Sequence, residues 1–286
     1  MLDTSSLSAL PDVCSEAGEF DEALRRHRAT VTLHASVAQA LDGSNADRVL
    51  TRFRGLRALG FGRFRESMGL GYYLRREAAG ESVGGVVEAK EGDISSLFLH
   101  SSDPGKFESL RVHAAGAWRS RARNQAAQMA VTAASLREHW SMLAKAKRRK
   151  MRPGLGGIEV SRSVVGDDTD EVRRVLVHGF GGEELAARAK RSPRTHRAHN
   201  VFAGLATLNI LGTMLGGEFT PAAPFMKLEK DDLNDTVLAA QAAYCDVYLV
   251  EDALLRQRLE LLVSRGYAFF EVRGVSEWLM APGLPV

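Results

Sequence analysis

Residues 228–252 read LEKDDLNDTVLAAQAAYCDVYLVED and predict a helix that leads into a buried strand. Small residues fill positions 236–243, and carboxylates stand at or before the start of this helix, where negative charge suits the helix dipole. These carboxylates belong to Asp231, Asp232 and Asp235. Residues 244–246 end the helix, and the apolar run Val-Tyr-Leu-Val at 247–250 is typical of a buried strand.

Carboxylates from both ends of the chain are expected to meet at one edge of a sheet. Asp252 follows the predicted strand, and Asp235 opens the helix that precedes it. Asp3 follows a very short apolar start and is itself followed by hydroxyl side chains. Helix starts and strand ends share the C-terminal edge of a parallel sheet, where open α/β folds build their sites.

The Asp-Thr-Ser opening at residues 3–5, together with the Asn-Asp, Ala-Ala and Cys-Asp-Val-Tyr-Leu-Val-Glu-Asp motifs within residues 234–252, resembles the PIN domain family of metal-dependent nucleases. The resemblance implies an α/β fold with a Rossmann-like parallel sheet flanked by helices. Residues 1–45 and 200–286 would form this PIN-like core. Residues 46–199 would form a large, mostly helical insertion or extension.

Four further stretches predict elements of the core. β-branched residues at 30–33 predict a second strand. Residues 253–264 predict an amphipathic helix, residues 267–272 a strand, and residues 275–279 a closing turn or helix. This finish is again similar to that of a PIN domain.

The resemblance also implies that Asp3, Asp235 and Asp252 bind Mg²⁺ or Mn²⁺ and are the catalytic residues. Hydrolysis of a phosphodiester bond requires an activated water and relief of phosphate charge, which hard divalent cations on oxygen ligands provide. Ser5 matches a position whose hydroxyl orients a ligand or a bound water. Taken singly, an aspartate at a strand end or helix start is more often a cap than a ligand.

One departure from the family pattern concerns a metal-binding glutamate. The helix after the second strand usually carries it, but residues 35–42 contain none, and Ala40 is closest to the expected position. Three explanations are open: the protein has lost catalysis, a substitution has inactivated it, or another acid such as Glu77 takes the place of the missing glutamate. The commoner interpretation of Glu77 is a solvated acid on a helix face, paired with nearby arginines.

Two basic clusters suit a polyanion, and the first holds six cations within residues 145–152. These are Lys145, Lys147, Arg148, Arg149, Lys150 and Arg152. We expect them to bind nucleic acid; the alternative is a solvated helix end whose cations suit the C-terminal dipole. The second cluster occupies residues 190–199.

Composition and charge limit the class of protein. The chain has 286 residues, 45% of them hydrophobic and 26% charged, as in a soluble globular protein. Its net charge of +3 does not by itself indicate a polyanion partner. Two cysteines without metal spacing, and the lack of a signal peptide, favour a reducing, cytoplasmic location. Residues 201–217 are short for a membrane span, so we expect a buried core helix and no membrane.

Three hypotheses follow. The first is a Mg²⁺- or Mn²⁺-dependent nuclease acting on RNA, of the kind the family supplies to toxin or defence systems, with a homodimer or a protein inhibitor as a partner. The second is a catalytically degraded PIN-like module that binds nucleic acid or protein without cleaving it. The third is a helical interaction protein whose acids are only helix caps. Replacing Asp3 or Asp252 with Asn distinguishes them.

Overall fold

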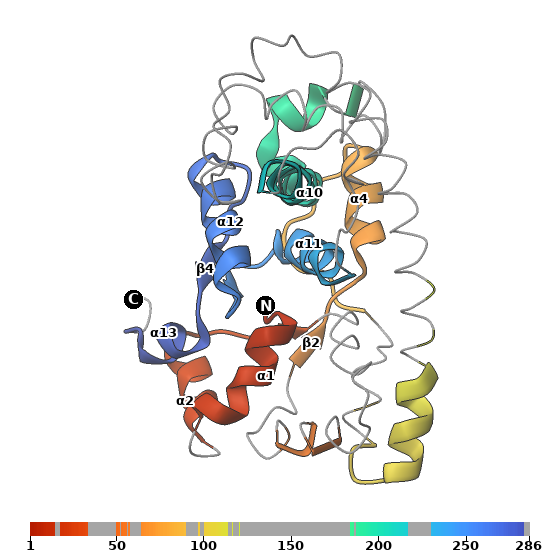
Figure 1. Cartoon of the computed structure of the whole chain (residues 1–286), viewed down its shortest axis with the longest axis vertical. Coiled ribbons are helices and arrows are strands. Elements are labelled where there is room, and N and C mark those ends of the chain that lie inside the picture. The colour runs from red at the N-terminus through yellow and green to blue at the C-terminus, as the bar shows by residue number, and fades with distance from the viewer. Residues whose placement is uncertain are drawn as a thin grey trace.

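The computed structural model describes six main stretches of the chain and several shorter pieces between them. The stretches are residues 1–14, 18–33, 64–89, 100–113, 187–216 and 230–282, and the pieces lie at 50–51, 53–55, 57, 97, 116, 120 and 184–185. Within them the chain is an α/β protein, with short parallel strands between helices (Figure 1).

The described strands form two parallel pairs. β1 (Val31–Leu33) pairs with β2 (Phe64–Glu66), and β3 (Val247–Leu249) pairs with β4 (Glu271–Arg273). The predicted strand at 247–250 is confirmed. The strand predicted at 267–272 begins later, because residues 265–267 form the turn that ends the preceding helix.

Residues 1–3 join the two pairs. On one side Leu2 forms a parallel bridge with Leu249, whose carbonyl oxygen accepts a hydrogen bond of 3.2 Å from the N–H of Asp3. On the other side the N–H of Leu2 donates to the carbonyl oxygen of Thr32 over 3.4 Å. The spatial order is therefore β2, β1, residues 1–3, β3 and β4, with the start of the chain in the middle.

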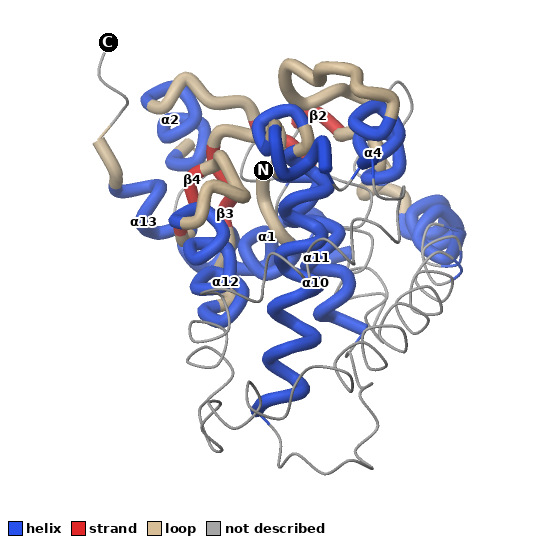
Figure 2. The backbone as a smooth tube through the Cα atoms, turned by 90° about the horizontal axis from the view of Figure 1, so that it is seen from above, coloured by secondary structure: helices blue, strands red, loops and turns tan. Residues whose placement is uncertain are grey.

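Helices cover both faces of these strands, as Figures 1 and 2 show from two directions. One group consists of α1 (Thr4–Val13), α2 (Glu19–Arg26) and α13 (Val275–Met280). The other group consists of α4 (Leu70–Ala78), α10 (Arg197–Gly216), α11 (Lys230–Ala242) and α12 (Ala253–Ser264). Each group has its own buried hydrophobic cluster against the strands.

Side-chain alternation decides which cluster each strand residue joins. Leu2 and its bridge partner Leu249 belong to the cluster of α1, α2 and α13. Met1 and Tyr248 belong to the cluster of α4, α10, α11 and α12. Because successive side chains of an extended segment point to opposite faces, Asp3 shares the face of Met1 and Tyr248.

Helix α10 confirms the helix expected at residues 201–217, and its burial over residues 201–206. The hydrophobic side chains there are at most 6% exposed. A side chain in place of Gly204 would have its Cβ only 2.7 Å from Cδ2 of Leu262 in α12, so glycine permits this close helix approach. No helix among the described residues is both long and apolar enough to cross a membrane.

The core also extends into the range assigned above to an insertion. β2 and α4 lie between residues 46 and 199, yet β2 pairs with β1, and Leu70 and Tyr73 of α4 belong to the main hydrophobic cluster. Strand β2 is only three residues long and reads Phe-Arg-Glu, so its sequence carries little apolar signal. Pairing with β1 makes it a strand.

Candidate functional site

Asp3 is a buried carboxylate at the C-terminal end of the central segment. It is 3% exposed and caps α1, since the N–H of Ser6 donates to its Oδ1 over 2.6 Å. The hydroxyl of Ser5 donates to its Oδ2 over 2.8 Å. Burial raises the pKa of Asp3, and these hydrogen bonds oppose that effect only in part.

Ser5 links Asp3 to the segment that follows β3. The Oγ of Ser5 accepts a hydrogen bond of 3.2 Å from the N–H of Glu251 while donating to Asp3. The C-terminal ends of residues 1–3 and of β3 are therefore held together. A role for Ser5 in orienting a metal ligand or a bound water stays a prediction.

Asp252 acts as a helix cap. Its Oδ1 accepts a hydrogen bond of 2.7 Å from the N–H of Leu255, and its side chain is exposed at the start of α12. This is the alternative role that the sequence left open for each aspartate. A role for Asp252 in metal binding stays a prediction.

Asp235 lies in α11, which packs against β3. It is half-buried, and its charge and that of Asp3 both act on the hydroxyl of Tyr248 in β3. Burial, followed by these two charges, raises the pKa of Tyr248 well above its usual range. Asp3 and Asp235, from opposite ends of the chain, thus approach the same buried group.

Two carboxylates and a neighbouring hydroxyl suit a hard cation such as Mg²⁺, which proteins commonly hold through one or two carboxylates. A larger ligand set is not seen in the described residues, where no three His, Cys, Asp or Glu side chains are grouped closely enough to hold a metal ion. Metal binding by Asp3 and Asp235 therefore stays a prediction.

Glu77 differs from the expectation of a solvated surface acid. It is 0% exposed, and its carboxylate accepts hydrogen bonds from the backbone N–H groups of Ala198 and His199, the His199 ring and the Tyr244 hydroxyl. The carboxylate therefore stabilises the start of α10 and joins it to α4 and to the end of α11. The sequence interpretation was wrong because these donors come from more than a hundred residues away.

The position of Glu77 also bears on its suggested role as a stand-in for the family glutamate. Tyr244, which donates to it, lies before β3, whereas Asp3 lies at the C-terminal end of its segment. Four donors already satisfy the Glu77 carboxylate. Glu77 is thus a structural acid, and the position of Ala40 lies outside the described residues.

The first basic cluster lies outside the described residues. Its members are Lys145, Lys147, Arg148, Arg149, Lys150 and Arg152. The second cluster, residues 190–199, is described, and there Arg194 and Arg197 lie over the ring of Phe269 at 5.1 and 5.7 Å from its centroid. These contacts hold the start of α10 against the segment before β4.

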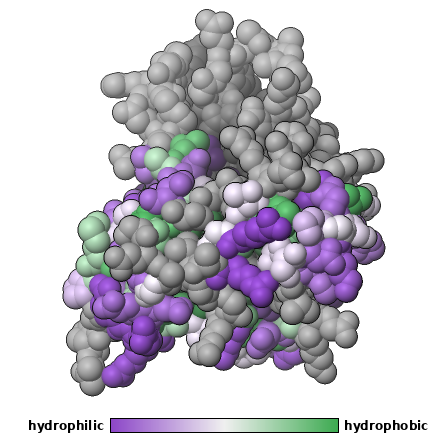
Figure 3. Space-filling view, turned by 90° about the horizontal axis from the view of Figure 1, so that it is seen from below, coloured by the Kyte–Doolittle hydropathy of each residue, from purple (hydrophilic) through white to green (hydrophobic). Residues whose placement is uncertain are grey.

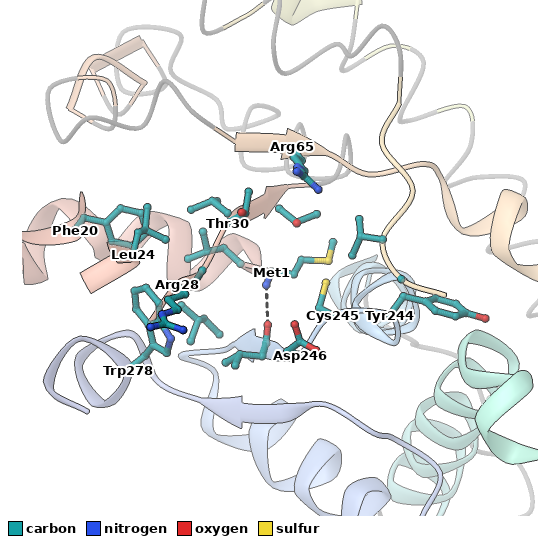
Figure 4. A pocket seen from close by; sticks show the side chains of 18 of the residues that line it. Met1, Phe20, Leu24, Arg28, Thr30, Arg65, Tyr244, Cys245, Asp246 and Trp278 are labelled. Atoms are coloured by element: carbon teal, nitrogen blue, oxygen red, sulfur yellow. Dashed lines mark hydrogen bonds between the residues drawn. The ribbon is translucent and has the colours of Figure 1, made fainter. Parts of the chain in front are cut away.

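A cavity of about 480 Å³ lies on the other edge of the strands (Figure 4). Arg28, Thr30, Arg65 and Asp246 line it, near the N-terminal ends of β1, β2 and β3. In Figure 4 the nitrogen of Met1 donates to the carbonyl oxygen of Val247 over 2.7 Å, which continues the strand pairing. None of the three predicted aspartates lines this cavity.

The surface seen from below is mainly hydrophilic where it is described, with scattered hydrophobic residues (Figure 3). The large hydrophobic side chains that are exposed among the described residues are Val112, Leu254, Val263 and Met280. Leu254 and Val263 both belong to α12, near its two ends. Single exposed apolar residues of this kind are normal on a protein surface.

No family model, curated protein or solved structure matches this chain.

Sequence reasoning missed two polar features of the described core. The first is the Glu77 network, whose members are far apart in the sequence. The second is Tyr248, which lies within an apolar run and gave only the signal of a buried strand residue. Its position between Leu2-Asp3 and α11 depends on strand pairing and could not be read from the local pattern.

Proposed function

We propose that this protein is a PIN-like nuclease that uses Mg²⁺ or Mn²⁺ to hydrolyse phosphodiester bonds, with RNA as its substrate. The observation that carries the proposal is the burial of the Asp3 carboxylate at the C-terminal end of the central segment. Burial of a carboxylate without a cationic partner is costly, and a divalent cation relieves that cost.

The order of the strands supports the same proposal. Residues 1–3 lie between β1 and β3, with β2 and β4 outside them, as a Rossmann-like sheet requires. In such sheets the C-terminal edge holds the site, and Asp3 lies there. Helix α11 carries Asp235 over the face of the strands that Asp3 shares.

Each residue has a separate task in the proposed reaction. Asp3 and Asp235 bind the cation, and the Ser5 hydroxyl holds Oδ2 of Asp3 while it accepts from Glu251. The bound cation supplies charge neutralisation at the phosphate and an acidified water for hydrolysis. We propose that Asp252, at the exposed side of this site, is a further ligand of the cation or helps to orient one of its ligands. The hydrophobic residues beneath Asp3 exclude bulk water from one side of the site.

The experiment compares wild-type protein with Asp3→Asn in Mn²⁺ binding by calorimetry and in cleavage of a fluorescent single-stranded RNA. Asn retains an oxygen that can cap α1, so the fold is expected to persist while both binding and cleavage are lost. Asp12→Asn, on the exposed side of the same helix, is the matched control. Unchanged Mn²⁺ binding in Asp3→Asn would refute the proposal.

A catalytically degraded module that binds nucleic acid or protein is the second candidate. It is favoured because no three His, Cys, Asp or Glu side chains of the described residues are grouped closely enough to hold a metal ion. In that case wild-type protein retains RNA in a gel-shift assay without cleaving it in Mn²⁺, and Asp3→Asn retains it equally well. Cleavage of single-stranded DNA in place of RNA would correct the substrate and keep the reaction.

We further propose a cytoplasmic role in a toxin or defence system, with a homodimer or a protein inhibitor as partner. Cys14 and Cys245 are both buried and unpaired, which is consistent with a reducing compartment. Light scattering of the purified chain, alone and after co-expression with its genomic neighbours, tests both partners.

A further inference from the structure

The hydroxyl of Tyr248 is an unusual polar group in the described core. Tyr248 is 0% exposed, and its hydroxyl oxygen has no hydrogen-bond partner among the residues described. A buried hydroxyl without a partner costs free energy, so native structures rarely keep one without a reason.

The other buried tyrosines of the same cluster show the contrast. The hydroxyl of Tyr73 accepts a hydrogen bond of 3.0 Å from the N–H of Val87, and the hydroxyl of Tyr244 donates to Glu77. All three tyrosines belong to one hydrophobic cluster. Of these three tyrosine hydroxyls, only that of Tyr248 has no hydrogen-bond partner among the described residues.

Strand register places Tyr248 and Asp3 on the same face of the strands, diagonally across two adjacent segments. Leu2 and Leu249 form a parallel bridge and face the cluster of α1, α2 and α13. Their neighbours Asp3 and Tyr248 therefore face the opposite side, on adjacent extended segments. Helix α11 covers that side and carries Asp235.

Packing and electrostatics agree with this placement. The ring of Tyr248 lies 5.8 Å from that of Phe270 at an angle of 82°, a tilted contact that fixes its orientation. After burial, the charges of Asp3 and Asp235 are the next largest causes of the raised pKa of Tyr248. The hydroxyl is thus both immobilised and within electrostatic reach of both carboxylates.

We propose that Tyr248 is a positioning residue of the Asp3–Asp235 site, whose hydroxyl would bond, once a divalent cation is bound, to a water molecule shared with the two carboxylates. This bond fixes the carboxylates in the orientation that a divalent cation needs. Ser5 and Ser6 already hold Asp3 from the side of α1, and Tyr248 holds it from the side of β3. The inference rests on the proposed function, because it assumes that these carboxylates bind a cation.

Removal of a residue that orients metal ligands typically weakens metal affinity by about 10–100-fold. We therefore expect Tyr248→Phe to bind Mn²⁺ about tenfold more weakly than wild type, or worse. The same substitution removes an unsatisfied polar atom, so in EDTA the urea midpoint of Tyr248→Phe should equal or exceed that of wild type.

The experiment measures Mn²⁺ affinity by calorimetry and the urea midpoint in EDTA for wild type, Tyr248→Phe, Tyr73→Phe and Asp3→Asn. Tyr73→Phe is the matched control, since it removes a buried hydroxyl that has a hydrogen-bond partner. It should lower the midpoint and leave Mn²⁺ affinity unchanged. Weaker Mn²⁺ binding in Tyr248→Phe at an undiminished midpoint would support the inference.

Three outcomes would overturn the inference. Unchanged Mn²⁺ affinity in Tyr248→Phe, with binding lost in Asp3→Asn, refutes the role of Tyr248 and leaves the proposed function intact. A lowered midpoint or failure to fold in EDTA refutes it too, because the hydroxyl would then have a structural partner in the metal-free protein. Absence of Mn²⁺ binding in wild type refutes both proposals.

Discussion

Replacement of Glu77 by Gln tests the buried network that joins α4, α10 and the end of α11. The amide nitrogen of Gln takes the place of one carboxylate oxygen and donates where an acceptor is needed. If the nitrogen replaces Oε1, the Tyr244 hydroxyl can rotate to accept a hydrogen bond from it, but the N–H of Ala198 loses its acceptor. If the nitrogen replaces Oε2, the N–H of His199 loses its acceptor instead.

The magnitude follows from these contacts. One buried N–H left without an acceptor costs about 1–3 kcal/mol. Loss of the negative charge at the start of α10 costs about 0.3–1 kcal/mol more, or up to ~2 kcal/mol when buried as here. We therefore expect Glu77→Gln to lower the free energy of unfolding by roughly 2–4 kcal/mol.

Urea unfolding followed by circular dichroism measures this change through the midpoint at constant slope. Glu81→Gln is the matched control, because Glu81 is half exposed and pairs with Arg76 at 2.7 Å. An exposed ion pair contributes about 0–1 kcal/mol, so the control should change little. If Glu77→Gln costs no more than Glu81→Gln, the reasoning about the buried network is refuted.

Two further predictions concern Asp3 and the contact between α10 and α12. Burial raises the pKa of Asp3 in the folded, metal-free protein. The stability that Asp3 contributes is therefore fully present below its unfolded pKa of about 3.9, and it is lost as the pH rises through the pKa of Asp3 in the folded state. In EDTA, Asp3→Asn should therefore gain stability relative to wild type between pH 3 and pH 7, and a constant difference in urea midpoint would contradict this. Gly204→Ala should lose about 1–3 kcal/mol, because its Cβ would lie 2.7 Å from the buried Leu262 side chain. Gly71→Ala, whose Cβ has no neighbour closer than 3.8 Å, should instead gain about 0.5–1 kcal/mol in thermal or urea unfolding.

The sequence of the C-terminal end determined most of the local structure there. Residues 253–264 were predicted as a helix and form α12 with the same bounds, and the apolar run at 247–250 forms β3. The closing turn or helix predicted at 275–279 is a helix, α13. These elements follow from apolar periodicity and helix caps, which act over a few residues and can therefore be read from the chain alone.

The polar features of the core were decided by tertiary structure. Glu77 and Tyr244 are 167 residues apart, and no local pattern distinguishes this acid from a solvated one. Strand β2 becomes part of the sheet only by pairing with β1. Tyr248 shares a face of the strands with Asp3 only because Leu2 pairs with Leu249. Burial and hydrogen bonding depend on which distant segments meet, so the sequence determined the candidate acids while the packing of the two chain ends decided which of them lie together.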